Sequence, residues 1–260
     1  MRNYASLCSC FFILLFVYQV SAQPMIIAHR GASFDAPENT LAAVHLAWQQ
    51  GADAVEVDVH LSADNRIMVI HDKDTKRTSG IDLKIKESSS SDLRKLDVGS
   101  FKSKEFKGEQ IPFLEEVIET IPKGKRLFVE IKSDETMLPV LKTLLEKSAK
   151  SGQIIIIGFD FETVERAKSM MPGIPVYWLK FSLIRYSKGI IARVKEAGLD
   201  GLNLHHRNIS KKFASKAKES GLGLYTWTVD DPKEAIRLQS ISIDGITTNR
   251  PFWLKQKMKE

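Results

Sequence analysis

Eight short runs of apolar residues, each followed by a stretch with helical character, recur along most of this 260-residue sequence. The runs begin near residues 25, 54, 126, 154, 174, 200, 222 and 243. Each is continuous rather than alternating, which is typical of strands in a parallel sheet that is covered on both faces. Eight strand–helix units predict an α/β fold, a closed (β/α)8 barrel (TIM barrel), whose functional residues gather at the carboxyl ends of the strands.

An open, doubly wound sheet is the alternative fold, but the sequence has no glycine-rich dinucleotide-binding turn to support it. One further strand, RIMVI at 66–70, follows turn residues outside the count of eight. From residue 73 to about 112 the periodicity stops, and Lys, Ser, Asp and Gly dominate. We expect this segment to be a small insertion subdomain that caps one end of a barrel domain spanning 23–260.

Residues 1–22 have the features of a secretory signal peptide: Arg2, an apolar run at 7–20, and the small residues Ser21 and Ala22. The run is shorter than the roughly 20 residues that span a bilayer. We therefore expect cleavage after Ala22, an exported protein in a periplasm or secreted, and no stable membrane anchor after cleavage.

Composition excludes several functional classes. Both cysteines, Cys8 and Cys10, lie in the leader, so the mature chain has no disulfide, thiol nucleophile or cysteine-ligated metal. The net charge of +6 includes Arg2, which leaves +5 after cleavage. The basic residues are interleaved with acidic ones, which favours a solvated surface over a nucleic-acid site. Oligomeric state is not specified by the sequence.

Residues 25–72 hold the densest chemistry in the chain. In AVEVDVH, Glu56 and Asp58 are two residues apart, so a strand points both side chains to one face while the intervening valines face the other. His29 and Arg30 follow the apolar run MIIA, and His71 ends the run RIMVI. Charged and imidazole side chains at the ends of several apolar strands indicate the rim of an active site.

A second pair of residues repeats this spacing. Glu130 and Lys132 in FVEIK also share one face of a strand. Three carboxylates that converged without compensation would repel one another, and a divalent cation would remove the repulsion. Three hard oxygen ligands suit Mg²⁺, Ca²⁺ or Mn²⁺. The alternative is that the carboxylates form separate ion pairs with Arg30 and Lys132.

Two of the six histidines suit acid–base catalysis. His29 and His71 lie at strand ends beside the expected metal site, and an imidazole with its ordinary pKa of about 6.5 can accept or donate a proton near neutral pH. His45 lies in an expected helix, and we expect His60 to lie off the face that Glu56 and Asp58 share.

Three aromatic residues follow later strands. His205 and His206 come after DGLNL and could line the pocket, although the sequence does not define their roles. Trp227 ends the run LYTW, where it could pack against an aliphatic part of a substrate or fill the core.

Together these motifs resemble the glycerophosphodiester phosphodiesterase family. The resemblance covers nearly the whole mature chain and is carried by HRGAS at 29–33, PENT at 37–40, EVDVHLSADNRIMVIHD at 56–72, VEIK at 129–132 and YTWTVD at 225–230. Two positions depart from the family pattern. Ser62 stands where the family often has threonine, and Asn249 where aspartate is common.

The resemblance implies a (β/α)8 barrel enzyme with one divalent metal held by Glu56, Asp58 and Glu130. It also implies that His29 and His71 serve as general base and general acid. The reaction would be hydrolysis of a small-molecule glycerophosphodiester to sn-glycerol 3-phosphate and an alcohol. Water or the glycerol 2-hydroxyl could be the attacking group, and the sequence leaves both open, as it does the preferred alcohol.

The family further implies that Arg30 and Lys132 hold the phosphate and that Trp227 lies beside the glycerol. Glu38 of the PENT motif would support these groups. A phospholipase D-like enzyme for lysophospholipids or sphingolipids on the same barrel is the main rival. A retaining glycosidase that uses two rim carboxylates, and a non-catalytic anion-binding barrel, are the others.

Overall fold

The computed structural model describes residues 23–182 and 189–260. Eight parallel strands close into a barrel, because β1 pairs with both β2 and β9. Around the barrel the order is β1 (Met25–His29), β2 (Ala54–Leu61), β4 (Arg126–Ile131), β5 (Ile154–Gly158), β6 (Val176–Lys180), β7 (Gly201–His205), β8 (Gly223–Trp227) and β9 (Gly245–Thr248). The (β/α)8 barrel expected from the eight apolar runs is confirmed.

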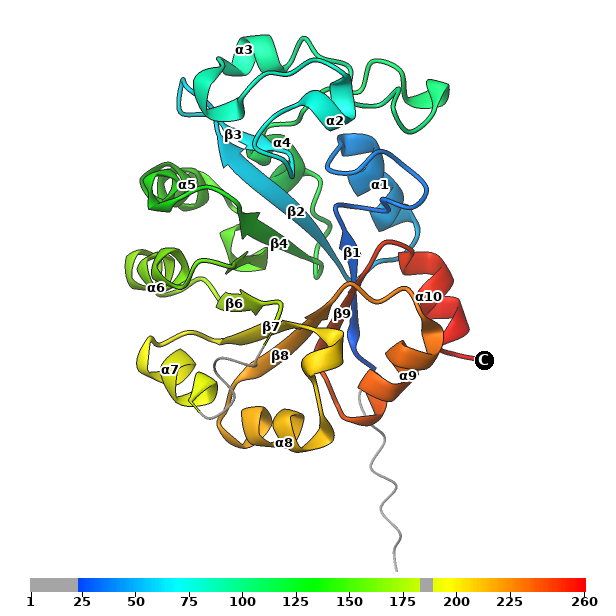
Figure 1. The fold of residues 1–260 in the computed structure, drawn as a ribbon, viewed down its shortest axis with the longest axis vertical. Helices are drawn as coiled ribbons and strands as arrows, with labels where there is room; N and C mark the ends of the chain where they lie inside the picture. Colours follow the sequence, from blue (N-terminus) through cyan, green and yellow to red (C-terminus); the bar gives the residue numbers. More distant parts are fainter. Residues whose placement is uncertain (1–22, 183–188) are drawn as a thin grey trace, which may run out of the picture.

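Helices surround the strands as an outer ring (Figure 1). They are α1 (Leu41–Gln49), α4 (Leu114–Glu119), α5 (Leu138–Lys147), α6 (Phe161–Met170), α7 (Ile190–Glu196), α8 (Lys211–Glu219), α9 (Pro232–Ser240) and α10 (Pro251–Lys257). Side-chain caps fix several starts: Thr40 accepts a hydrogen bond from the Ala43 amide at the start of α1, and Asp160 and Ser210 cap α6 and α8 in the same way. Short 3₁₀ turns occur at Glu135–Met137, Ser151–Gln153 and His206–Asn208.

Within residues 23–182 and 189–260, no helix combines the length and apolar character that crossing a bilayer requires. The expected signal peptide, residues 1–22, lies outside the described residues.

The barrel has two separate apolar layers. Alternate strand residues such as Val55 and Val57 face outward and pack against the helices. Inside the barrel, the rings of Phe128, Tyr177 and Tyr225 stack edge-to-face, with centroids 5.1 and 4.9 Å apart. These rings fill part of the interior, and the polar side chains of β2 and β4 occupy another part.

The segment between β2 and α4 departs from the barrel pattern. Strand β3 (Ile67–Val69) pairs antiparallel with β2, and then come α2 (Lys76–Ser79), a 3₁₀ turn (Ile85–Glu87), α3 (Ser90–Leu93) and a 3₁₀ turn (Lys104–Phe106). In Figure 1 these elements lie beside β3, next to α1 and α4. They share a small apolar cluster made by Met68, Ile70, Ile85, Leu93, Leu96, Val98 and Ile111.

Asp64 joins the β2–β3 turn to this segment. It accepts hydrogen bonds from the Ser62 hydroxyl (2.6 Å), the Ser90 amide (2.8 Å) and the Ser90 hydroxyl (2.7 Å). The hydrogen bonds from Ser62 and Ser90 lower the pKa of Asp64 to about 2. A carboxyl whose pKa falls on folding stabilises the native state above its unfolded pKa, and that contribution disappears as the pH drops toward the folded pKa.

We expect Asp64→Ala to reduce the free energy of unfolding by about 1 kcal/mol at neutral pH, a modest value because the site is exposed. The difference between wild type and variant should shrink as the pH falls from 4 toward 2. Urea unfolding at several pH values measures both effects, and a difference that stays constant with pH would contradict this role.

Candidate active site

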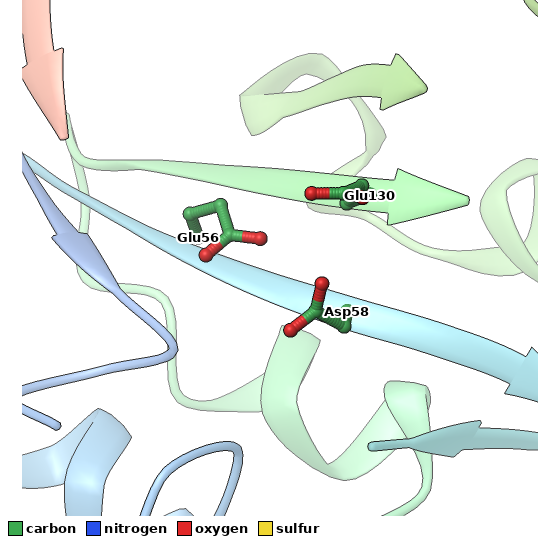
Figure 2. Close-up of side chains that lie close together, drawn as sticks. All are labelled: Glu56, Asp58 and Glu130. Atoms are coloured by element: carbon green, nitrogen blue, oxygen red, sulfur yellow. The ribbon is translucent and has the colours of Figure 1, made fainter. Parts of the chain in front are cut away.

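Three carboxylates from the neighbouring strands β2 and β4 lie close together (Figure 2). In the β2–β4 register Asp58 is the direct neighbour of Glu130, and Glu56 lies two residues earlier on the same face of β2. Their ligand oxygens lie within 4.8 Å of one another, and the residues are 3, 1 and 8% exposed for Glu56, Asp58 and Glu130. The spacing-based prediction that these residues share a face is confirmed.

The electrostatics of this cluster are unfavourable for three ionised carboxylates alone. Burial, followed by the charge of Asp58, raises the pKa of Glu56 well above its usual range and that of Glu130 to about 7. Glu56 Oε1 and Asp58 Oδ1 are buried and find no hydrogen-bond partner among the described residues. Such oxygens are expensive to bury and are suited to ligating a cation.

Two cationic side chains offset part of this charge. Arg30 Nε lies 3.1 Å from Asp58 Oδ2. Lys132 Nζ lies 2.8 Å from Glu130 Oε1 and 3.7 Å from Asp58 Oδ1. Because Asp58 contacts both cations, the carboxylates form one cluster rather than the separate ion pairs that the sequence left open.

The backbone after β1 turns sharply to place Arg30. Its φ of 55° is in the left-handed region, which is uncommon for a residue with a side chain. In this conformation its amide donates to Glu56 Oε2 (3.0 Å) and its guanidinium donates to Glu38 Oε1 (2.9 Å). Gly31 follows with φ 81°, and a Cβ there would lie 2.5 Å from the carbonyl carbon of Ala43. Glycine is required at this close approach.

His29 is held in one tautomer by a chain of hydrogen bonds. The Asn249 amide nitrogen donates to Asp230 Oδ2 (2.6 Å), so its oxygen must face His29. His29 Nδ1 therefore donates to Asn249 Oδ1 (2.7 Å), which leaves Nε2 without a proton in the neutral ring, 4.0 Å from Glu56 Oε2. Burial, and then the charge of Arg30, lowers the pKa of His29 below 6.5.

His71 is held by a carboxylate instead. Its Nδ1 lies 2.7 Å from Asp72 Oδ1. His60 also holds the backbone of His71 in place, because its Nε2 donates a hydrogen bond to the backbone carbonyl of His71 (3.0 Å). The expectation that His60 lies off the face of Glu56 and Asp58 is wrong. It is two residues beyond Asp58 in β2, so it has the same phase, and its ring is turned toward the segment that carries His71.

A cavity of about 230 Å³ opens beside the cluster. Charged and imidazole groups line one part of it, and apolar and aromatic groups line another, with Trp227 and Phe159 packed edge-to-face at 5.4 Å. Its lining residues are His29, Arg30, Glu56, His71, Glu130, Lys132, Ile157, Phe159, Leu179, Asn203, Trp227, Thr228 and Thr247. Seven of the residues singled out in the sequence therefore meet at one cavity, and Asp58 contacts two of them, Arg30 and Lys132.

Some residues behave differently from the sequence analysis. His205 and His206 are not among the residues that line the cavity. His205 contacts the Trp227 ring, with centroids 5.6 Å apart, and His206 pairs with Glu234. Asn203 and Phe159 line the cavity although no motif indicated them. The only available signal for Asn203 was a polar residue in the middle of the apolar run DGLNL.

Comparison with known proteins decides the family. The profile of the glycerophosphoryl diester phosphodiesterase family matches residues 29–252. The chain belongs to this family. A glycerophosphodiester phosphodiesterase from Caldanaerobacter subterraneus is 34% identical over 235 residues, which cover 87% of this chain and 94% of that protein. Another from Bacillus subtilis is 27% identical over 246 residues, with 87% and 84% covered.

A solved structure extends the comparison to the fold. A phosphodiesterase from Oleispira antarctica, in complex with the product sn-glycerol-3-phosphate, superposes with a TM-score of 0.83 at 29% identity and covers 92% of this chain and 98% of its own. The family resemblance read from the motifs is confirmed. The chain is thus an enzyme, a glycerophosphodiester phosphodiesterase, and the cavity described above is its candidate active site.

Proposed function

We propose that this enzyme hydrolyses small glycerophosphodiesters to sn-glycerol 3-phosphate and an alcohol, and that one divalent cation at Glu56, Asp58 and Glu130 is required. The observation that carries the proposal is the convergence of three buried carboxylates, two histidines and two cationic side chains on one cavity. A phospholipase D-like activity gains no support from the relatives described above, whose names give a phosphodiesterase.

The donor set fits a hard divalent cation. The ligands would be carboxylate oxygens, two of which have no hydrogen-bond partner among the described residues, and this chemistry suits Mg²⁺ or Ca²⁺, with Mn²⁺ also accommodated. When bound, the cation polarises the phosphoryl oxygens and neutralises negative charge. The protein holds the three carboxylates together and buries them. Their mutual repulsion then favours binding of a cation.

Arg30 and Lys132 are proposed to bind the phosphate. Both line the cavity, and both donate hydrogen bonds to carboxylates, Arg30 to Glu38 and Lys132 to Glu130. Their positions are therefore fixed before substrate binds. Fixed cationic donors stabilise the charge that develops on a phosphoryl group in the transition state. Trp227 and Phe159, which also line the cavity, would pack against the carbon atoms of the glycerol.

His29 and His71 are proposed to move the protons. Each has Nδ1 held by an oxygen, Asn249 Oδ1 or Asp72 Oδ1, which leaves its Nε2 for chemistry. One imidazole takes the proton of the attacking hydroxyl while the other protonates the departing alkoxide. The attacking hydroxyl belongs to water or to the glycerol itself.

We also propose that the protein is exported, to a periplasm or out of the cell, after removal of residues 1–22. This proposal rests on the sequence pattern alone. Export would place the enzyme where it can scavenge glycerol phosphate from small diesters. N-terminal sequencing of the protein recovered outside the cytoplasm tests it, with a first residue near Gln23 expected.

The reaction is tested with the protein lacking residues 1–22 and with glycerophosphocholine as substrate. We expect sn-glycerol 3-phosphate and choline in equal amounts, each measured with a coupled enzyme assay. Glycerol and phosphocholine as products would mean that the other ester bond is cleaved, and absence of turnover on every glycerophosphodiester tried would contradict the proposal.

A further inference from the structure

Arg77 lies outside the cavity, but it contacts two carboxylates that each hold a residue lining the cavity. It belongs to α2 in the segment inserted after β3, and its side chain is 45% exposed. No sequence motif indicated Arg77, and it is not one of the residues that line the cavity. Its guanidinium nevertheless makes three short hydrogen bonds, all to carboxylates.

The three hydrogen bonds divide between two carboxylates. Nη1 and Nη2 of Arg77 donate to the two oxygens of Glu38, at 2.9 and 2.8 Å, and Nε donates to Asp72 Oδ2 at 2.7 Å. A guanidinium is a planar fork, so this arrangement fixes the relative positions of both carboxylates. Glu38 comes from the loop before α1 and Asp72 from the loop after β3, so Arg77 joins two separate parts of the chain.

Each of these carboxylates in turn holds an active-site side chain. Glu38 Oε1 also accepts from Arg30 Nη1 (2.9 Å), and Asp72 Oδ1 is the partner of His71 Nδ1 (2.7 Å). Arg77 is therefore one carboxylate away from the proposed phosphate ligand and one carboxylate away from a proposed proton-transfer group.

Helix α2, which carries Arg77, lies within a loop whose two ends are joined by side-chain contacts. The Thr75 hydroxyl donates to the carbonyl of Ile81 (2.5 Å) and accepts from the Leu83 amide (3.1 Å), and Asp74 pairs with Lys84 across the base of the loop. Because the loop is closed by these contacts, the ordering of Arg77 costs less conformational entropy than it would on a free chain.

We propose that Arg77 is a positioning residue that fixes His71 through Asp72 and Arg30 through Glu38, so that the inserted segment completes the active site. The inference rests on the roles proposed above for His71 and Arg30. Without Arg77, Asp72 loses its guanidinium donor, and Glu38 keeps only Arg30. The side chains of His71 and Arg30 would then be free to shift by up to about an ångström, which is enough to lower catalysis.

We expect Arg77→Ala to lower kcat/KM for glycerophosphocholine about 10- to 100-fold, the range for loss of a group that orients others. Added guanidinium at millimolar concentration should restore part of the activity, because the vacated site is open to solvent. Arg77→Lys should recover little, since one ammonium cannot bridge both carboxylates. The double variant Arg77→Ala/Asp72→Asn should be less impaired than the product of the two single effects.

Arg94 provides the matched control. It is an arginine of the same inserted segment, bidentate to Glu116, and it touches neither Glu38 nor Asp72. Arg94→Ala should lower the melting temperature yet keep kcat/KM near wild type, with no response to guanidinium.

His71→Ala separates the failure of this inference from failure of the proposed roles. If that variant is inactive while Arg77→Ala keeps wild-type kcat/KM, the inference is overturned and the roles stand. An Arg77→Ala defect that matches the Arg94→Ala defect and does not respond to guanidinium also overturns it. If His71→Ala is fully active, the proposed role of His71 is wrong, and the inference falls with it.

Discussion

Replacing His71 by alanine should reduce kcat for glycerophosphocholine hydrolysis about 10²- to 10⁴-fold, and His29→Ala should have an effect of the same order. Both imidazoles line the cavity and both have one nitrogen held by an oxygen, so removal of either leaves a proton without a carrier. Neither side chain belongs to the apolar core, so circular dichroism and the melting temperature should change little.

His45→Ala is the matched control for both variants. His45 is exposed on α1, away from the residues that line the cavity, and its replacement should leave kcat and KM unchanged. Activity that survives both His29→Ala and His71→Ala would contradict the mechanism. It would favour chemistry that needs only carboxylates, such as a retaining glycosidase.

Glu56→Gln should abolish cation binding while leaving the metal-free protein as stable as wild type or more stable. Three buried carboxylates repel one another, and burial beside Asp58 raises the pKa of Glu56, so an ionised Glu56 opposes folding above its ordinary pKa. Glutamine removes that charge and one ligand together. We expect kcat to fall at least about 10²-fold.

Thermal unfolding with and without cation separates these two effects. At a Mg²⁺ or Ca²⁺ concentration about 100 times Kd, wild type should gain about 2.7 kcal/mol of stability, and Glu56→Gln should gain none. Glu87→Gln, an exposed carboxylate in the inserted segment, should respond to the cation as wild type does. An equal cation-induced rise in all three proteins would show that the cation binds elsewhere.

The barrel was predictable because each of its strands is buried on both faces and therefore appears as a continuous apolar run. Strand β5, IIIIG, is the clearest case. The inserted segment was not predictable beyond its boundaries. Its helices have four residues or fewer and depend on side-chain contacts such as those of Asp64 with Ser62 and Ser90, which have no periodicity.

The carboxylate cluster was predictable from a period of two, which places Glu56 with Asp58 on one face of a strand. The support around it was not. The left-handed backbone of Arg30, the Asn249–His29 contact across 220 residues and the place of Asn203 in the cavity all depend on barrel closure and register. His60 was expected to follow the strand and to lie off the face of Glu56 and Asp58, whereas β2 extends to Leu61 and includes His60 on that face.

We propose that this active site hydrolyses glycerophosphodiesters only with a divalent cation bound by Glu56, Asp58 and Glu130. The most direct test is release of sn-glycerol 3-phosphate from glycerophosphocholine by protein stripped with EDTA, with elemental analysis to verify removal. We expect no release until Mg²⁺, Ca²⁺ or Mn²⁺ is added back, and then a saturable return of activity. Undiminished release by the verified metal-free protein would contradict it.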